Sequence, residues 1–198
     1  IVNTSDNFQF STGSPTGMPL TSGNAQTFGV VNPSVAITAT GPGAGMFTVA
    51  SSNAIVYQLS LAATLNSTDL SSITLTTAGT YTTADFVANS FRLWYNPLSS
   101  ALTGATQLGT DQSLVSSGST FSFSGLSQKI TMGSTGFFLV TVDVAASPTR
   151  GHTFSITSTP HSQIVFSHAG ATNTGIDPAR LGGTQVFTPI VTAAEVIL

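Results

Sequence analysis

Apolar and polar residues alternate with a period of two in several separate stretches of the chain. Such alternation predicts strands with one buried and one exposed face, because successive side chains of a strand point to opposite faces of a sheet. The positions expected to point inward are Ile55, Tyr57, Leu59 and Leu61; Phe121 and Phe123; Phe138, Val140, Val142 and Val144; and Phe154 and Ile156. No stretch has the spacing of an amphipathic helix, and residues 83–88 are expected to form one short helical turn at most.

Further strands are expected over residues 34–40, 72–77, 90–95 and 163–167, with turn-forming Gly, Pro, Asn and Ser residues between them. Many short strands at this spacing predict an all-β fold. We expect a two-sheet antiparallel β-sandwich over residues 33–187. Residues 1–32 are then an N-terminal extension and a possible donor strand, and residues 188–198 a C-terminal strand or tail.

Charged residues make up only 6% of the 198 residues, against about 25% in an ordinary globular domain. Hydrophobic residues reach 40%, so the chain can still build a core. The four basic residues are scattered along the sequence and form no cluster. Binding of nucleic acid or of anionic membranes requires such a cluster of cations. The longest apolar run, residues 136–146, is too short to span a bilayer and contains Asp143. We expect no nucleic-acid partner and no membrane insertion.

The chain contains no cysteine, which rules out a disulfide framework and thiolate metal sites. It begins with Ile1 rather than methionine, which is compatible with the removal of a signal peptide. Scarce lysine and arginine leave few sites for trypsin-like proteases, which suits a durable extracellular protein. We therefore expect a secreted protein that is extracellular or on a cell surface.

Several pieces of the sequence follow one another in a recognisable order. They include Ile55-Val56-Tyr57-Gln58-Leu59-Ser60, Phe91-Arg92-Leu93-Trp94-Tyr95, Phe121-Ser122-Phe123-Ser124-Gly125-Leu126, Gly136-Phe137-Phe138-Leu139-Val140-Thr141-Val142-Asp143-Val144 and Gly182-Gly183-Thr184-Gln185-Val186-Phe187. In this order they resemble a repeat module of secreted, multidomain surface proteins of Bacteroidota-type bacteria. The resemblance implies an immunoglobulin-type sandwich in an exported bacterial protein and carries no catalytic role. The chain differs from such proteins in having one copy of the module rather than a tandem array.

No sequence motif indicates catalysis. The segment Gly125–Lys129 lacks the second glycine of a Gly-x-Ser-x-Gly nucleophile elbow. A pair of catalytic carboxylates is not apparent, since the one glutamate, Glu195, lies in the C-terminal segment. Asp85 is expected to cap a turn, and Asp143 to lie at a surface strand position. We therefore expect no enzyme activity.

The sequence also lacks a recognisable metal site. His152, His161 and His168 do not have the spacing of zinc ligands. Acidic residues are too sparse for a tight oxygen cage, although Asn173 and Asp177 leave a weak ion open as an alternative. We expect no bound metal and no cofactor.

Carbohydrate binding is one candidate function. If Phe91 and Leu93 point into the core, Trp94 points outward beside Arg92. An exposed indole can stack on a sugar ring while polar neighbours orient the sugar. The competing explanation is a tryptophan that stacks against Arg92 and is covered by a loop. Trp94 and Arg92 are thus the candidate residues of an adhesin or glycan-binding module.

Self-association is the function that the composition favours most. Charged side chains, lysine above all, commonly protect sheet edges from pairing with other chains, and this chain has few of them. We expect a structural subunit of an extracellular filament or surface assembly, joined to copies of itself by strand exchange or head-to-tail packing. The segment 1–12 is slightly preferred as donor, because a Gly/Ser-rich stretch follows it. The candidate interface residues are Phe8 and Phe10 in that segment, and Ile190, Ala194, Val196 and Leu198 in the C-terminal one.

Overall fold

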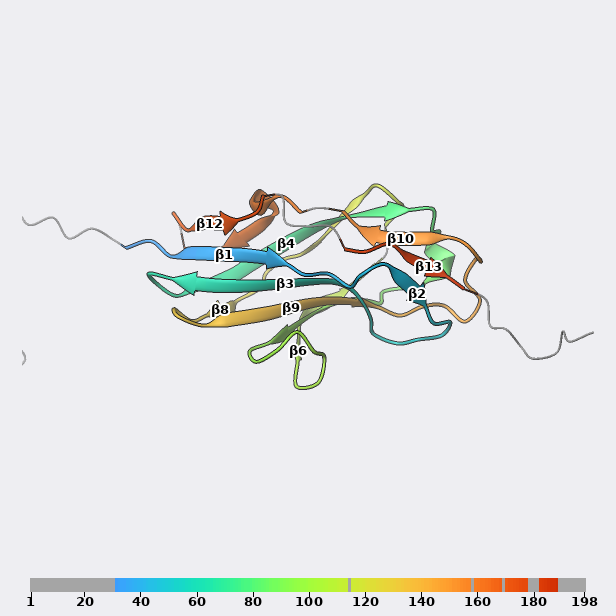
Figure 1. The fold of residues 1–198 in the computed structure, drawn as a ribbon, viewed down its shortest axis with the longest axis horizontal. Helices are drawn as coiled ribbons and strands as arrows, with labels where there is room; N and C mark the ends of the chain where they lie inside the picture. Colours follow the sequence, from blue (N-terminus) through green and yellow to red (C-terminus); the bar gives the residue numbers. More distant parts are fainter. Residues whose placement is uncertain (1–30, 114, 158, 169, 178–181, 189–198) are drawn as a thin grey trace, which may run out of the picture. The chain divides into compact units, whose positions relative to one another are not determined.

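The computed structural model describes residues 31–113, 115–157, 159–168, 170–177 and 182–188, and Figure 1 shows their ribbon. Two short 3-10 turns, η2 (Thr83–Asp85) and η3 (His161–Gln163), accompany the strands. The strands are β1 (Ser34–Ala39), β2 (Gly45–Phe47), β3 (Ala54–Thr64), β4 (Thr68–Gly79), β5 (Phe91–Asn96), β6 (Thr106–Gln112), β7 (Thr120–Phe123), β8 (Gln128–Ile130), β9 (Thr135–Val142), β10 (Thr153–Ile156), β11 (Ile164–Phe166), β12 (Thr172–Gly175) and β13 (Gln185–Phe187). None of the helical segments in this part of the chain could cross a bilayer.

The strands form two sheets that share one core, which confirms the predicted all-β sandwich. The first sheet has the strand order β12-β1-β3-β9-β5-β6. The second has the order β11-β4-β10-β13-β2, with β7 and β8 also paired to the long strand β4. Every run in which we expected alternating inward positions lies in a strand of one of these sheets, because each supplies an apolar face to the core.

The sheets are mixed, whereas we expected them to be purely antiparallel. Strand β1 pairs in parallel with β12, and β13 pairs in parallel with β2. Parallel partners cannot be joined by a tight hairpin, so they come from distant parts of the chain. Turn signals between neighbouring strands give no information about such pairs, and this is why the expectation was wrong on this point.

Aromatic rings fill the core near β2, β10 and β13. Phe86 lies at the centre of this cluster. Its ring centroid is 5.1–5.9 Å from those of five neighbours, Phe47, Tyr81, Phe91, Phe154 and Phe187. Most of these pairs are tilted or edge-to-face, the arrangement that the quadrupoles of aromatic rings favour. Towards the start of β1 the core is mainly aliphatic, with Val35, Ile37, Leu61, Leu70 and Ile130 buried.

Strand β3 departs from strict alternation at one position. A register shift between Ile55 and Tyr57 places an additional residue, Val56, opposite β9. Val56 and Tyr57 are both buried, whereas Ile55, which we expected to point inward, is partly exposed. A β-bulge of this kind re-aims side chains locally. Beyond it Leu59 and Leu61 are buried as predicted.

The described chain enters the sandwich at one end and leaves it at the other. At one end, called the β1 end, Ser34 pairs with Thr64 and Thr172. At the other, called the β13 end, Phe187 pairs with Phe47. Figure 1 shows β1 beginning at the left of the sandwich and β13 ending at the right. The described residues therefore start and finish at opposite ends of the domain.

Candidate functional site

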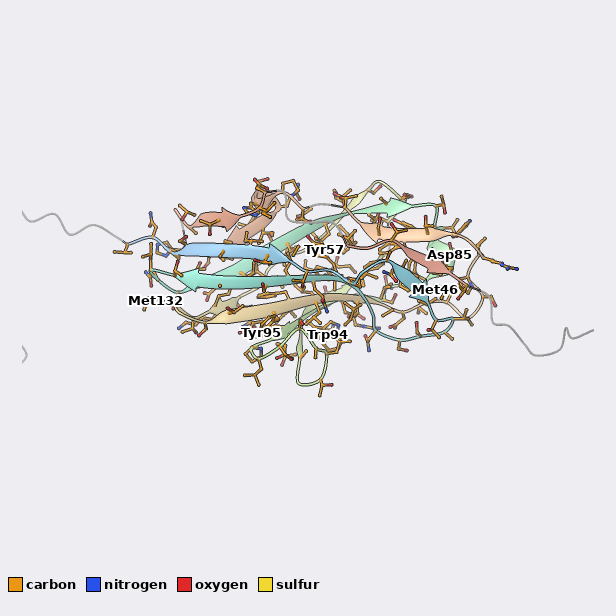
Figure 2. The ribbon with its side chains drawn as sticks, viewed as in Figure 1. Met46, Tyr57, Asp85, Trp94, Tyr95 and Met132 are labelled. Atoms are coloured by element: carbon orange, nitrogen blue, oxygen red, sulfur yellow. The ribbon has the colours of Figure 1, made fainter. Side chains whose placement is uncertain are left out.

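Large apolar side chains are exposed in the turns of the β1 end. Val31, Leu65 and Met132 keep 55%, 65% and 55% of their surface accessible. Hydrogen bonds hold these turns together: the Asn66 side chain donates to the carbonyl of Val31 at 3.2 Å, and the Met132 N–H donates to the Ser67 hydroxyl at 2.9 Å. Figure 2 places Met132 at this end. We call these three apolar residues the β1-end patch.

Leu65 also has a strained backbone. Its φ is +68°, in the left-handed region. For a residue with a Cβ this conformation costs about 1–2 kcal/mol. Turns of this kind normally carry Gly, Asn or Asp. Leu65 is thus both strained and largely exposed.

The β13 end also exposes apolar side chains. Met46 on β2 keeps 71% of its surface accessible, and Val87 follows η2 with 47%. Thr188 lies here too, where its hydroxyl donates to the carbonyl of Phe47 at 3.3 Å. Both ends of the sandwich thus present apolar surface, and the chain passes through both.

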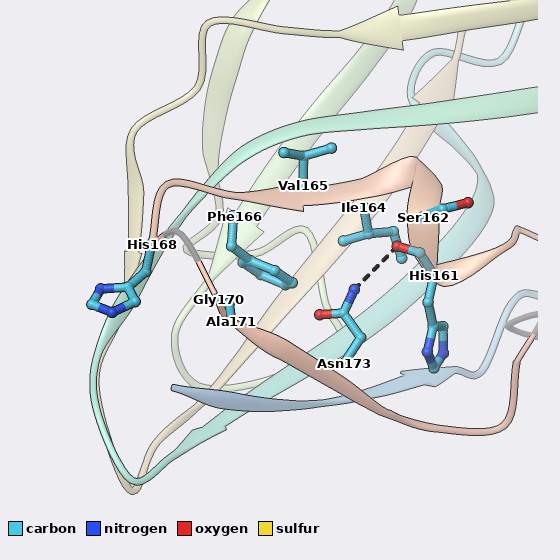
Figure 3. Close-up of a pocket in the computed structure, with 9 residues that line it drawn as sticks. All are labelled: His161, Ser162, Ile164, Val165, Phe166, His168, Gly170, Ala171 and Asn173. Carbon is cyan, nitrogen blue, oxygen red and sulfur yellow. Dashed lines mark hydrogen bonds between the residues drawn. The ribbon is translucent and has the colours of Figure 1, made fainter. Parts of the chain in front are cut away.

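A groove of about 300 Å³ lies between β11 and β12. These two strands are edges of different sheets, so the groove lies along one open side of the sandwich. Figure 3 shows the residues that line it. They are His161, Ser162, Ile164, Val165, Phe166, His168, Gly170, Ala171 and Asn173. Ile164 is buried and Phe166 packs against the core, so the inner wall of the groove is apolar.

Two polar atoms in the wall of this groove lack hydrogen-bond partners among the described residues. They are Nε2 of His161 and Oδ1 of Asn173. The Asn173 side-chain amide donates to the carbonyl of His161 at 3.1 Å, and the His161 backbone N–H donates to Asp177 at 2.9 Å. An unpaired buried donor or acceptor costs about 1–3 kcal/mol. Both atoms are themselves shielded from solvent, so this cost falls inside the wall and not on the open surface of the groove.

Trp94 and Arg92 lie on the outer face of the six-stranded sheet, as predicted. Arg92 forms a bidentate ion pair with Asp143, with both contacts at 2.9 Å, and its Nε donates to Asp111 at 3.0 Å. The Trp94 indole donates to the hydroxyl of Thr141 at 2.8 Å. Both side chains are already engaged within the sheet, so few of their donors remain for a sugar.

The acid in this ion pair is strongly held in its charged form. Burial raises the pKa of Asp143, but hydrogen bonds from Arg92 and from the N–H of Asn53 outweigh it and lower the pKa below its usual value. The charge of Arg92 is correspondingly neutralised within the sheet. The network therefore stabilises the fold around the ends of β5 and β9.

Sequence analysis missed a covered position on the same outer face. Leu139 is completely buried although it lies between Trp94 and Gln58 in the sheet. The Gln58 side chain donates to the carbonyl of Ser100 at 3.1 Å, so the loop between β5 and β6 crosses β9 to reach β3. Leu139 lies in a continuous apolar run, and that run is the one signal that could have revealed it.

Asp85 is the most completely buried carboxylate described, and it caps a turn as predicted. It accepts hydrogen bonds from the N–H groups of Thr82 and Thr149 and lies 2.7 Å from Nδ1 of His152. Burial raises the pKa of Asp85, but these hydrogen bonds outweigh it and lower the pKa to about 2. The network ties η2 to the turn before β10, which is a structural role.

The three histidines lie apart. His152 contacts Asp85, whereas His161 and His168 line the groove. Within the described ranges, no three His, Cys, Asp or Glu side chains gather closely enough to hold a metal ion. The predicted interface residues Phe8, Phe10, Ile190, Ala194, Val196 and Leu198 lie outside the described residues.

Comparison with known proteins gives no family for this chain. No model of a known protein family matches the sequence, and no curated protein matches it. The function is therefore argued from the surfaces described above.

Proposed function

We propose that this chain is a non-catalytic structural subunit of an extracellular filament or surface assembly, in which copies pack head to tail. The observation that carries the proposal is the exposed apolar surface at both ends of the sandwich, with strained Leu65 in the β1-end patch. Head-to-tail stacking buries the β1-end patch of one copy against Met46 and Val87 of the next. Repetition of such a heterologous contact gives an open fibre.

The size of the β1-end patch limits the free energy of association that this contact can supply. Full burial of a large apolar side chain yields about 1.5–3 kcal/mol, and because only 55–65% of each of these three is still accessible, covering them yields about 3–5 kcal/mol together. Association costs about 4–15 kcal/mol in lost freedom. End-to-end packing alone is therefore weak, and a stable polymer needs a further contact between copies.

The proposal is tested by placing a charge at the end of the sandwich. Met132→Asp should reduce polymer formation by the full-length chain at least tenfold, because it buries a carboxylate in the contact. Leu98→Asp is the matched control, since Leu98 is 87% exposed on the loop between β5 and β6 and not at an end. Light scattering and electron microscopy measure the result. A wild-type chain that stays monomeric at high concentration, or equal effects of the two substitutions, would refute the proposal.

The alternative function, an adhesin or carbohydrate-binding module, depends on the outward face that carries Trp94 and Arg92. Its support is weaker because Arg92 is paired with Asp143 and Asp111. It predicts that the chain binds some glycan on an array and that Trp94→Ala abolishes that binding. An array without a single bound glycan removes this alternative.

A further inference from the structure

From the groove between β11 and β12 we infer a strand-acceptor site whose occupant is the segment 188–198 of a second copy. This inference rests on the proposed function and supplies the further contact that end-to-end packing needs. The observation behind it is that two open sheet edges and an apolar wall meet in one groove.

Both strands that border the groove have an unpaired edge within the described part of the chain. Strand β12 pairs with β1 alone, and β11 with β4 alone. The N–H of Thr172 donates to the carbonyl of Pro33 on the β1 side. Since alternate residues of a parallel strand direct their backbone groups to the same neighbour, Asn173 directs its own to the open side. An extended segment laid along this edge can pair with those groups.

The segment 188–198 has the pattern that such a groove requires. Ile190, Ala194, Val196 and Leu198 fall on one face of an extended chain, and Glu195 falls on the other together with Val191, Ala193 and Ile197. The face without a charge matches the wall formed by Ile164 and Phe166, and this orientation keeps the glutamate towards solvent. Eleven extended residues reach about 36 Å, at about 3.3 Å per residue. The segment is therefore long enough to cross between copies and still cover a short edge strand.

The positions of the two chain exits decide between the candidate donors. The groove opens at the β1 end, where Gly170 lies beside Asn32. In a head-to-tail stack, Thr188 of one copy lies at the β1 end of the next and can feed residues 188–198 into its groove. The N-terminal segment joins the domain at Val31, at the β1 end, and in the same stack this end meets the neighbour's β13 end. The structure thus favours the C-terminal segment over the N-terminal one that sequence analysis slightly preferred.

A complementation experiment with full-length chains tests the inference. Val196→Asp breaks the donor and leaves the groove intact, whereas Ala171→Trp fills the groove and leaves the donor intact. Each variant alone should be monomeric. An equimolar mixture should form 1:1 dimers and nothing longer, because a single donor–groove pair remains. Ile197→Asp is the matched control on the opposite face of the segment and should polymerise like wild type. Sedimentation velocity measures the sizes.

Failure of the inference and failure of the proposed function give different results. A wild-type chain that never polymerises contradicts the proposed function. A Val196→Asp chain that polymerises like wild type, or a variant mixture without dimers, overturns the strand-acceptor site while head-to-tail packing stands. If Ala171→Trp does not fold, as judged by its thermal unfolding, Val165→Asp on β11 replaces it.

Cysteine cross-linking distinguishes exchange between copies from docking within one copy. The chain has no native cysteine, so Ala171→Cys and Val196→Cys can be placed on separate chains. Under oxidising conditions the mixture should give a disulfide-linked heterodimer, whereas Ala171→Cys mixed with Phe8→Cys should give at least tenfold less. A dilute double variant that forms its disulfide within one chain would overturn the inference.

Discussion

Among the described residues, buried polar atoms are hydrogen-bonded around Asp85, whereas two of them are unpaired at the groove between β11 and β12. Asp85 is fully buried, and its carboxylate receives hydrogen bonds from two backbone N–H groups while also contacting His152. In the groove, Nε2 of His161 and Oδ1 of Asn173 have no partner in the described structure. Buried polar groups are nearly always paired, so the first region is complete by itself and the second is not.

The same contrast appears in the apolar residues. Around Phe86 the rings pack on every side, whereas Phe166 is only partly buried at the groove. At the β1 end Leu65 and Met132 are more than half exposed. This contrast supports the proposal that copies meet at the groove and at the β1-end patch. Four measurements test this contrast.

The largest expected effect comes from core truncation. Phe86→Ala should lower the free energy of unfolding by about 3–5 kcal/mol, because it leaves a cavity among closely packed rings. Phe166→Ala should cost less than half as much in the monomer, since its ring is partly exposed already. Urea unfolding of the two variants measures both values. Equal losses would show that the groove is packed like the core and would contradict the contrast.

The second-largest effect should come from acid, which protonates Asp85. The pKa of Asp85 is lowered to about 2, from about 3.9 in an unfolded chain. A carboxylate whose pKa is lowered by folding stabilises the native state at pH values above its unfolded-state pKa. This stabilisation is lost as the pH falls through the folded-state pKa. Between about pH 4 and pH 2 the free energy of unfolding should drop by about 2 kcal/mol from this group. Asp85→Asn should be less stable at neutral pH and show a flatter pH profile; an unchanged profile would refute the assignment.

A smaller effect of opposite sign is expected at Leu65. Leu65→Gly relieves the left-handed backbone strain and should raise the free energy of unfolding of the monomer by about 0.5–1 kcal/mol. The same change removes an apolar side chain from the β1-end patch, so it should weaken assembly. Thermal unfolding and light scattering together separate the two effects. A variant that is more stable and assembles as well as wild type would remove Leu65 from the contact.

Salt should have the smallest effect. The residues assigned to the contact between copies are apolar, and screening acts on charges. Raising the NaCl concentration from about 0.05 M to 0.5 M should therefore change the extent of assembly by less than twofold. Polymers that dissociate as salt increases would show that ion pairs join the copies.

Sequence analysis predicted β1, β3, β4, β5, β7, β9, β10 and β11 at least in part, and missed β2, β6, β8, β12 and β13. Strands β3, β9 and β10 were found because each buries an apolar face of four or more residues or carries aromatic residues. Strands β2 and β8 have three residues each, and β12 reads Thr-Asn-Thr-Gly, so alternation gives no signal there. Their pairing with distant strands, not their own composition, makes them strands.

The site was predictable to a similar degree. The outward positions of Trp94 and Arg92 followed from alternation, but their partners Asp143 and Thr141 lie on β9 and could not be inferred. The groove was not predictable, because His161 and Asn173 meet only through the turn between β11 and β12. One local signal was available at the β1 end, since the apolar residues in Leu65-Asn66-Ser67 and Met132-Gly133 occupy turns that polar residues normally fill.

The positions of β1 and β13 determine how the domain bears tension. Each of these strands lies between two partners, β1 between β12 and β3, and β13 between β10 and β2. Force applied outward at Val31 and Thr188 runs along both strands, as their directions in Figure 1 show. The backbone hydrogen bonds on either side are then loaded together in shear and do not open one after another, so the domain resists extension most strongly along its own length.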